Sequence, residues 1–171
     1  MNTAAETDRT SRCPVCSGAE LRSETRTETF DYDGDGDKVQ VTVDKVPVEV
    51  CPACGEVFSG PEAGRIRNEA ICKALGYLTP QEIRRVRERL NLTQAGFAQL
   101  TGIGEATISR WERGRLIQNR AMNQYLSLLA YDPGIEVTLL RIKFLQKAGG
   151  SLFVDADNSQ SGNQVADVLQ Q

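Results

Sequence analysis

The stretch TQAGFAQLTGIGEATISRWERG, residues 93–114, decides the fold of the second half of this 171-residue chain. Its spacing is that of two short helices joined by a tight turn, with Thr93 as a hydroxyl N-cap, Gly102 in the turn and Gly114 at the end. Apolar residues that would dock the two helices recur along it: Phe97, Ala98, Leu100, Ile103, Ile108 and Trp111. A helix-turn-helix of this kind presents its second helix to DNA.

The second helix of this motif keeps polar side chains that can meet base edges and phosphates. They are Glu105, Thr107, Ser109, Arg110 and Arg113. Arginine can address guanine O6 and N7 with two hydrogen bonds, so Arg110 is the strongest candidate for a base contact. The sequence therefore predicts a protein whose partner is double-stranded DNA.

The charges of the chain divide by region. Residues 1–60 carry 12 acidic and 6 basic side chains, whereas residues 61–133 carry 7 acidic and 11 basic ones. The helix-turn-helix thus lies in the only basic segment, as phosphate affinity requires. The acidic half would be repelled by DNA and needs another partner.

Composition is typical of a globular protein, with 40% hydrophobic and 25% charged residues. No apolar run is long enough to span a membrane, and residues 1–12 are polar, without the apolar segment of a secretory signal. We therefore expect a cytoplasmic protein with no membrane association, whose thiols stay reduced.

Two CxxC knuckles, Cys13-Pro-Val-Cys16 and Cys51-Pro-Ala-Cys54, are separated by 34 residues in a chain without histidine. Four thiolates can complete a tetrahedral zinc site, so we expect one structural Zn²⁺ ion on Cys13, Cys16, Cys51 and Cys54. The alternatives are disulfides, unpaired thiols, a redox dithiol or a rubredoxin-like iron site. No plausible nucleophile and base pair is evident, so no catalytic residue and no enzyme activity are expected.

Between the knuckles, valines alternate with polar residues in two runs, at positions 39, 41 and 43 and at positions 46, 48 and 50. Both runs and the threonine-rich segment 21–32 are typical of half-buried strands. We expect a small antiparallel sheet that a structural zinc, worth roughly 10 to 16 kcal/mol, holds together.

The sequence DYDGDGDK places Asp31, Asp33, Asp35 and Asp37 as in the first half of an EF-hand loop. The twelfth position is Thr42 rather than a bidentate glutamate, and the flanks are typical of strands. Asp-Gly pairs between alternating strands indicate a solvated hairpin tip, with weak calcium binding as the minor alternative.

Further helices surround the motif. A proline-initiated helix is expected from about residue 61 to Leu75, and its Cys72 is expected to be a small core or surface residue. A capping box at Thr79 and Glu82 starts the next helix, and a later apolar face lies within residues 121–129. Residues 79–131 should therefore form a bundle of four or five helices. Four arginines of this segment are expected to stay solvated, with phosphate contact as the alternative: Arg84, Arg85, Arg87 and Arg89.

The segment LTQAGFAQLTGIGEATISRWERG, residues 92–114, resembles the helix-turn-helix of the Cro and XRE repressor family in its LTQ start, glycine turn and ISRWERG close. The resemblance implies that Thr93 and Gln94 approach the DNA backbone and that Ser109 and Arg113 lie near phosphate. It implies the following base-reading positions: Glu105, Ala106, Thr107 and Arg110. Glu105 and Ala106 replace the more usual amides, so the operator sequence is not predicted.

The whole arrangement of a CPxC and CPxCGE module followed by a helix-turn-helix, about residues 10–133, resembles the MqsA-type antitoxins, also described as YgiT-type zinc-finger proteins. In that family the zinc module neutralises a toxin, commonly an RNA-cleaving one, and the dimeric helix-turn-helix represses the operon that encodes both. The resemblance implies a homodimer on operator DNA and a basic, RNase-like toxin as partners. An acidic module facing such a toxin makes electrostatic sense.

We therefore expect an α+β protein with a flexible N-terminus (1–12), a four-cysteine zinc-binding β module (13–60), a linker helix (61–78), a DNA-binding domain (79–133) and a C-terminal extension (134–171). Residues 135–147 favour a helix useful as a dimer contact, with an added strand as the alternative, and the polar remainder is expected to be partly flexible. The predicted function is an antitoxin and autorepressor. The alternatives are a stand-alone regulator of the same class and a redox protein that uses Cys51 and Cys54.

Overall fold

The computed structural model describes residues 12–34, 36–132 and 134–149, which form three strands followed by six helices. The elements are β1 (Arg22–Gly34), β2 (Asp37–Val50), β3 (Val57–Phe58), α1 (Pro61–Leu75), α2 (Pro80–Arg89), α3 (Gln94–Thr101), α4 (Glu105–Glu112), α5 (Arg120–Tyr131) and α6 (Ile135–Lys147). The predicted α+β class is confirmed. The chain divides after Tyr131 into two units, and the described residues of each unit are treated separately.

The sheet is antiparallel in the order β1-β2-β3, and the two valine runs lie on one continuous strand, β2. The pairing shifts between Arg26 and Glu28, where Thr27 faces the two residues Asp44 and Lys45. Lys45 has a positive φ of 57°, and the Thr27 hydroxyl donates to Asp44 Oδ1 at 2.8 Å. This β-bulge changes which alternate residues face inward, so that both valine runs point to the same side.

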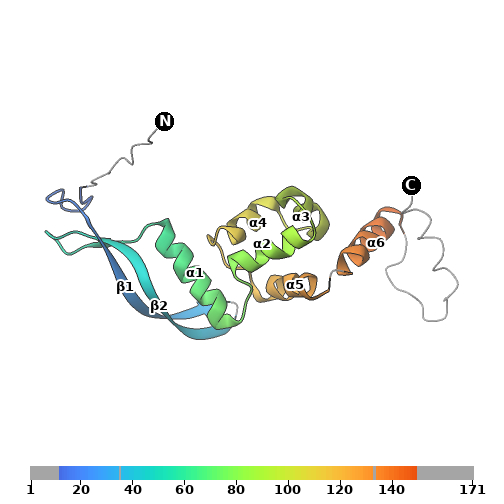
Figure 1. Ribbon diagram of the computed structural model, residues 1–171, viewed down its shortest axis with the longest axis horizontal. Coiled ribbons are helices and arrows are strands. Elements are labelled where there is room, and N and C mark those ends of the chain that lie inside the picture. Colours follow the sequence, from blue (N-terminus) through green and yellow to red (C-terminus); the bar gives the residue numbers. More distant parts are fainter. Residues whose placement is uncertain (1–11, 35, 133, 150–171) are drawn as a thin grey trace, which may run out of the picture. The chain divides into compact units, whose positions relative to one another are not determined.

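The core of the sheet lies under α1, which Figure 1 shows running along it. On the sheet side it consists of Val41, Val43, Val46 and Val48, and on the helix side of Ala63 and Ile71. Gly60 and Pro61 begin α1, and Gly76 ends it in the left-handed conformation, as the sequence predicted. Cys72 lies in this helix and is 2% exposed, so of the two predicted positions, core or surface, it occupies the core.

The hairpin predicted at the Asp-Gly pairs is present, because β1 and β2 pair as far as Gly34 opposite Asp37. Near this end Lys38 forms an exposed ion pair with Asp33 at 3.0 Å, and Gln40 donates to Asp31. Asp35 lies outside the described residues, so calcium binding stays a prediction.

Four helices, α2 to α5, form the predicted bundle, in which α4 packs against α2 and α3, and α2 packs against α5. The capping box at the start of α2 is complete: Thr79 accepts from the Glu82 N–H, and Glu82 accepts from the Thr79 N–H. Of the six packing residues predicted for the helix-turn-helix, Ala98 and Ile103 are partly buried and the other four are buried. Buried among them are Phe97, Leu100, Ile108 and Trp111.

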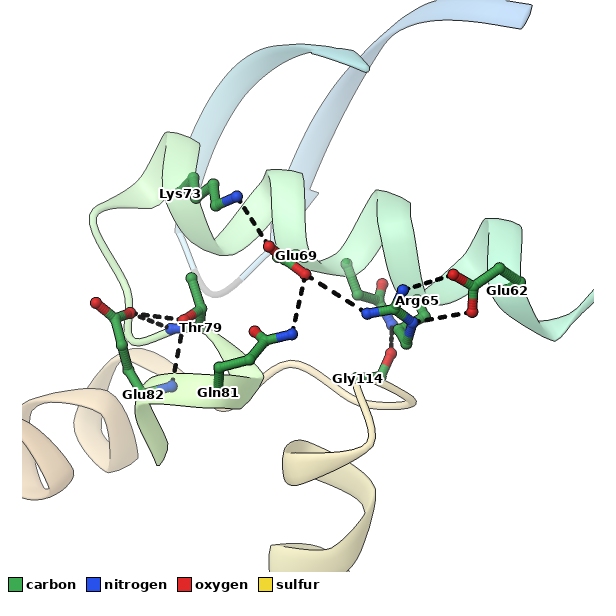
Figure 2. A network of polar contacts seen from close by, with 9 residues as sticks. Glu62, Arg65, Glu69, Lys73, Thr79, Gln81, Glu82 and Gly114 are labelled. Carbon is green, nitrogen blue, oxygen red and sulfur yellow. Dashed lines mark hydrogen bonds and ion pairs between the residues drawn. The ribbon is translucent and has the colours of Figure 1, made fainter. Parts of the chain in front are cut away.

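Polar contacts join α1 to the helical bundle within the first unit. In Figure 2, Glu69 of α1 lies between Lys73 and Arg65, and it accepts a hydrogen bond from Gln81 of α2 at 3.4 Å. Asn68 Nδ2 also donates to the Gly114 carbonyl at 2.9 Å. The α1 helix thus contacts both the start of α2 and the loop that ends α4.

The second unit contains α6, which confirms the helix predicted for residues 135–147. None of its residues is fully buried, and Val137, Leu140 and Phe144 are each about half exposed. That α6 makes a dimer contact stays a prediction, as do the domain boundaries at residues 60 and 78. The flexibility expected for residues 1–12 and for the chain end concerns segments that lie almost wholly outside the described residues.

Candidate metal centre and nucleic-acid interface

The four knuckle cysteines gather at one end of the sheet. Cys13 and Cys16 precede β1, and Cys51 and Cys54 lie in the turn between β2 and β3. The Cys13 and Cys54 sulfur atoms are 3.7 Å apart, those of Cys16 and Cys51 are 3.6 Å apart, and all four lie within 4.8 Å of one another. Zinc–sulfur bonds of about 2.3 Å in a tetrahedron place sulfur atoms about 3.8 Å apart, so the thiolate set fits a zinc ion.

The two knuckles have the same backbone construction. The N–H of Ser17 donates to the Cys13 carbonyl, and the N–H of Gly55 donates to the Cys51 carbonyl, each at 2.9 Å. Both donors have positive φ values, 53° for Ser17 and 76° for Gly55. The tight turns bring each pair of cysteines to one side, and their four thiolates fill the four positions of a structural zinc site.

The backbone also favours the thiolate form of the buried ligand Cys51. Hydrogen bonding from the Cys54 backbone N–H lowers the pKa of Cys51 to about 6. The fifth cysteine, Cys72, lies in α1 outside this cluster, and burial raises the pKa of its thiol to about 11. Cys72 is therefore an apolar packing residue, and the metal set consists of the four knuckle cysteines.

The proposed DNA-facing helix is α4, which the turn after α3 presents with its polar residues outward. Thr93 caps α3 by accepting from the Gly96 N–H at 3.1 Å, and Gly102 ends it with a φ of 78°. Gly104 then caps α4, and Gly114, with a φ of 65°, ends the motif. The two glycines with positive φ occupy the places where a side chain would strain the turn.

The structure brings six of the eight predicted contact residues together on α4 and its C-cap. Glu105, Ala106, Arg110 and Arg113 are exposed, and Thr107 and Ser109 are partly exposed. Thr93 and Gln94 lie apart from them, at the start of α3. Thr93 is exposed, whereas the Gln94 amide donates to Glu112 at 2.8 Å and is partly buried.

The prediction that Arg87 stays solvated is wrong. Arg87 donates two hydrogen bonds to Glu112, from Nε at 2.6 Å and from Nη2 at 2.9 Å, and a third to the Leu92 carbonyl. The Glu112 side chain is fully buried, and only 13% of the Arg87 side chain is exposed. The sequence carried a signal: positions 83, 86, 87 and 90 have helical spacing, which places Arg87 beside the apolar face of α2.

The ion pair sets the charge state of Glu112. Burial raises the pKa of this carboxyl, but hydrogen bonds from Arg87 and Gln94, with the positive charges of Arg87 and Arg84, outweigh burial and hold it below its usual range. Glu112 is therefore a carboxylate at neutral pH, and it ties the end of α4 to α2 and to the start of α3.

Comparison with known protein families finds that the chain matches a family model described as the antitoxin component of a bacterial toxin-antitoxin system, MqsA. The match extends over residues 11–139, which contain the cysteine knuckles, α1 and the helix-turn-helix. No curated protein matches the chain. Among the described residues, no helix has both the length and the apolar character needed to cross a bilayer.

Proposed function

The chain belongs to the MqsA family, the antitoxin components of bacterial toxin-antitoxin systems, and we propose that it acts as both a toxin neutraliser and an autorepressor. Family membership indicates a regulatory role rather than an enzymatic one. The acidic zinc-bound sheet would bind the toxin, and the helix-turn-helix would bind the operator. The observation that supports this division most directly is that α4 and its C-cap expose Glu105, Ala106, Arg110 and Arg113 within the only basic segment of the chain.

On the DNA side, we assign the base contacts to Glu105, Ala106, Thr107 and Arg110 and the phosphate contacts to Thr93, Ser109 and Arg113. The N-terminal residues of a recognition helix contact base edges, and exposed arginines are suited to guanine or to phosphate. Gln94 contributes mainly through Glu112, whose position it helps to fix. One such helix contacts few base pairs, so we propose that a homodimer binds a palindromic operator.

Arg110→Ala tests the base contact. We expect the variant to lose about 1 to 3 kcal/mol of binding free energy on the operator and little on random DNA, because only the guanine contact depends on sequence. Fluorescence anisotropy on both DNAs measures this difference. Arg113→Ala is the matched control, since removal of a phosphate contact weakens both complexes alike. Equal losses for Arg110→Ala on the two DNAs would contradict the assignment and make Arg110 a phosphate contact.

On the toxin side, the polar face of the sheet and its edge strand β1 carry the negative charge. Asp31 and Glu49 are exposed on the side of the sheet opposite the buried valines, and Glu24 is exposed on the edge strand, where it pairs with Val48. Residues 1–60 have a formal net charge of −6. Such a surface attracts a basic protein and accelerates its association at low salt.

A small basic protein encoded next to this antitoxin is therefore expected to co-purify with the full-length chain. The complex should associate more slowly as salt rises, because ions screen the acidic surface. Co-expression followed by size-exclusion chromatography and stopped-flow mixing measures both effects. Operator binding without any neighbour-encoded partner would instead indicate the stand-alone regulator.

A further inference from the structure

A cavity of about 420 Å³ lies where α1, α2 and the loop after α4 meet. Its charged lining residues are four arginines and two glutamates: Arg65, Arg84, Arg113, Arg115, Glu62 and Glu112. The three elements belong to the same compact unit, and polar contacts between them hold the walls together. The cavity is therefore a defined feature of the fold with an unusual density of guanidinium groups.

Both carboxylates of the cavity already have arginine partners. Arg65 donates to Glu62 with two nitrogen atoms, as Figure 2 shows. Arg87, behind the cavity wall, donates to both oxygen atoms of Glu112. Each carboxylate thus has its own close arginine partner, and the remaining arginines add positive charge that only the longer Arg84–Glu112 ion pair of 3.7 Å partly offsets.

Those remaining arginines are Arg84, Arg113 and Arg115. Arg84 Nε is 3.7 Å from Glu112 Oε2, which is beyond a good hydrogen bond, and the Arg84 side chain is 51% exposed. Arg113 and Arg115 are exposed, and within the described part of the chain their guanidinium groups have no hydrogen-bond or ion-pair partner. Guanidinium groups placed in this way have donors available for an oxyanion.

The loop that carries two of these arginines is held in place by α1. Gly114 separates them, with a φ of 65°, and a Cβ there would lie 2.7 Å from Arg65 Cγ. Asn68 fixes the same residue by donating to its carbonyl. The close approach of α1 therefore positions Arg113 and Arg115 beside Arg84 rather than leaving them on a free loop.

We propose that this cavity, walled by α1, α2 and the loop after α4, binds a phosphate group through Arg84, Arg113 and Arg115. One possible source of this phosphate is the operator backbone, and that source depends on the DNA binding proposed above. The cavity lies at the C-terminal end of α4, about 12 Å along the helix axis from Glu105 at its start. A backbone phosphate beside the groove that α4 enters would reach the three arginines. A free phosphate compound would bind to the same guanidinium groups.

Inorganic phosphate added to the zinc-loaded, full-length protein tests the cavity without DNA. At constant ionic strength, phosphate should shift the Nε–Hε NMR signals of Arg84, Arg113 and Arg115 in a saturable way, while chloride should not. The signal of Arg85 serves as the internal control, because Arg85 follows Arg84 in α2 but lines a different cavity. Shifts at the three arginines would support the phosphate site whether or not the protein binds DNA.

DNA titrations over a range of salt concentrations distinguish the two sources. If the operator backbone supplies the phosphate, Arg84→Ala and Arg115→Ala should each reduce the slope of log K against log salt by about 0.9, equally on operator and random DNA. Arg85→Ala should leave the slope unchanged. Unchanged slopes with phosphate-dependent NMR shifts would identify a free phosphate compound as the ligand. Unchanged slopes without such shifts would overturn the proposed phosphate site. If the unmodified protein binds no DNA at all, that result would refute only the proposed function.

Discussion

The full-length Cys51→Ser protein is expected to lose its zinc and the ordered sheet between residues 13 and 58. Cys51 is fully buried, and the sheet core beneath α1 consists mainly of four valines, which is too little to order the module alone. Loss of the site removes a contribution of about 10 to 16 kcal/mol. Zinc analysis should find no bound metal, and the amide NMR signals of β1 and β2 should lose their dispersion.

Cys72→Ala is the matched control for this experiment. It also removes a buried thiol, but one that lies in α1 outside the metal cluster, so one zinc ion per chain should remain. The signals of α2 to α5 should persist in the Cys51→Ser protein, because that bundle has its own core around Phe97, Ile108 and Leu126. A zinc-free Cys51→Ser protein with an intact sheet would show that packing under α1 suffices for folding.

Arg87→Ala should destabilise the protein by about 3 to 5 kcal/mol, because it removes the bidentate partner of the fully buried Glu112 carboxylate. The free energy of unfolding, measured in urea at pH 7, checks this value. Arg85→Ala, an exposed arginine of the same helix, should change stability by less than about 0.5 kcal/mol. A similar small change for Arg87→Ala would mean that the ion pair contributes little.

The contribution of Glu112 to the pH dependence of stability should have opposite signs in the unmodified chain and in the Arg87→Ala variant. The folded-state pKa of Glu112 is depressed, so its contribution is complete above the unfolded pKa of about 4.3 and is lost as pH falls through the folded value. Without Arg87, burial dominates and raises that pKa, so protonation should favour the folded variant. Acidification from pH 7 to 5 should therefore narrow the stability gap between Arg87→Ala and the unmodified chain.

The sequence predicted those features correctly that depend on a few neighbouring residues. The knuckle spacing identified the metal ligands, and Thr79, Thr93 and Gly102 marked helix ends that the structure has at the same residues. Short-range signals of this kind arise because caps and turns depend on a few neighbouring residues.

Features that depend on pairing between distant segments were not predicted. The inward-facing valines switch from odd to even positions between Val43 and Val46. Only the pairing with β1 shows that a β-bulge at Lys45 makes this switch within a single strand. Arg87 and Glu112 are 25 positions apart, and their ion pair follows from how α2 packs on α4. The arginine cavity likewise needs α1 beside the loop after α4, which no spacing along the chain reveals.

The all-cysteine composition of the metal site has a consequence for charge regulation. A divalent zinc ion held by four thiolates leaves two negative charges, whereas neutral thiols would leave none. Loading the site therefore takes the formal charge of residues 1–60 from −6 to −8. A bound zinc ion would thus make this half more strongly anionic, so the supply of zinc would change both its stability and its long-range attraction for the basic toxin that we propose as its partner.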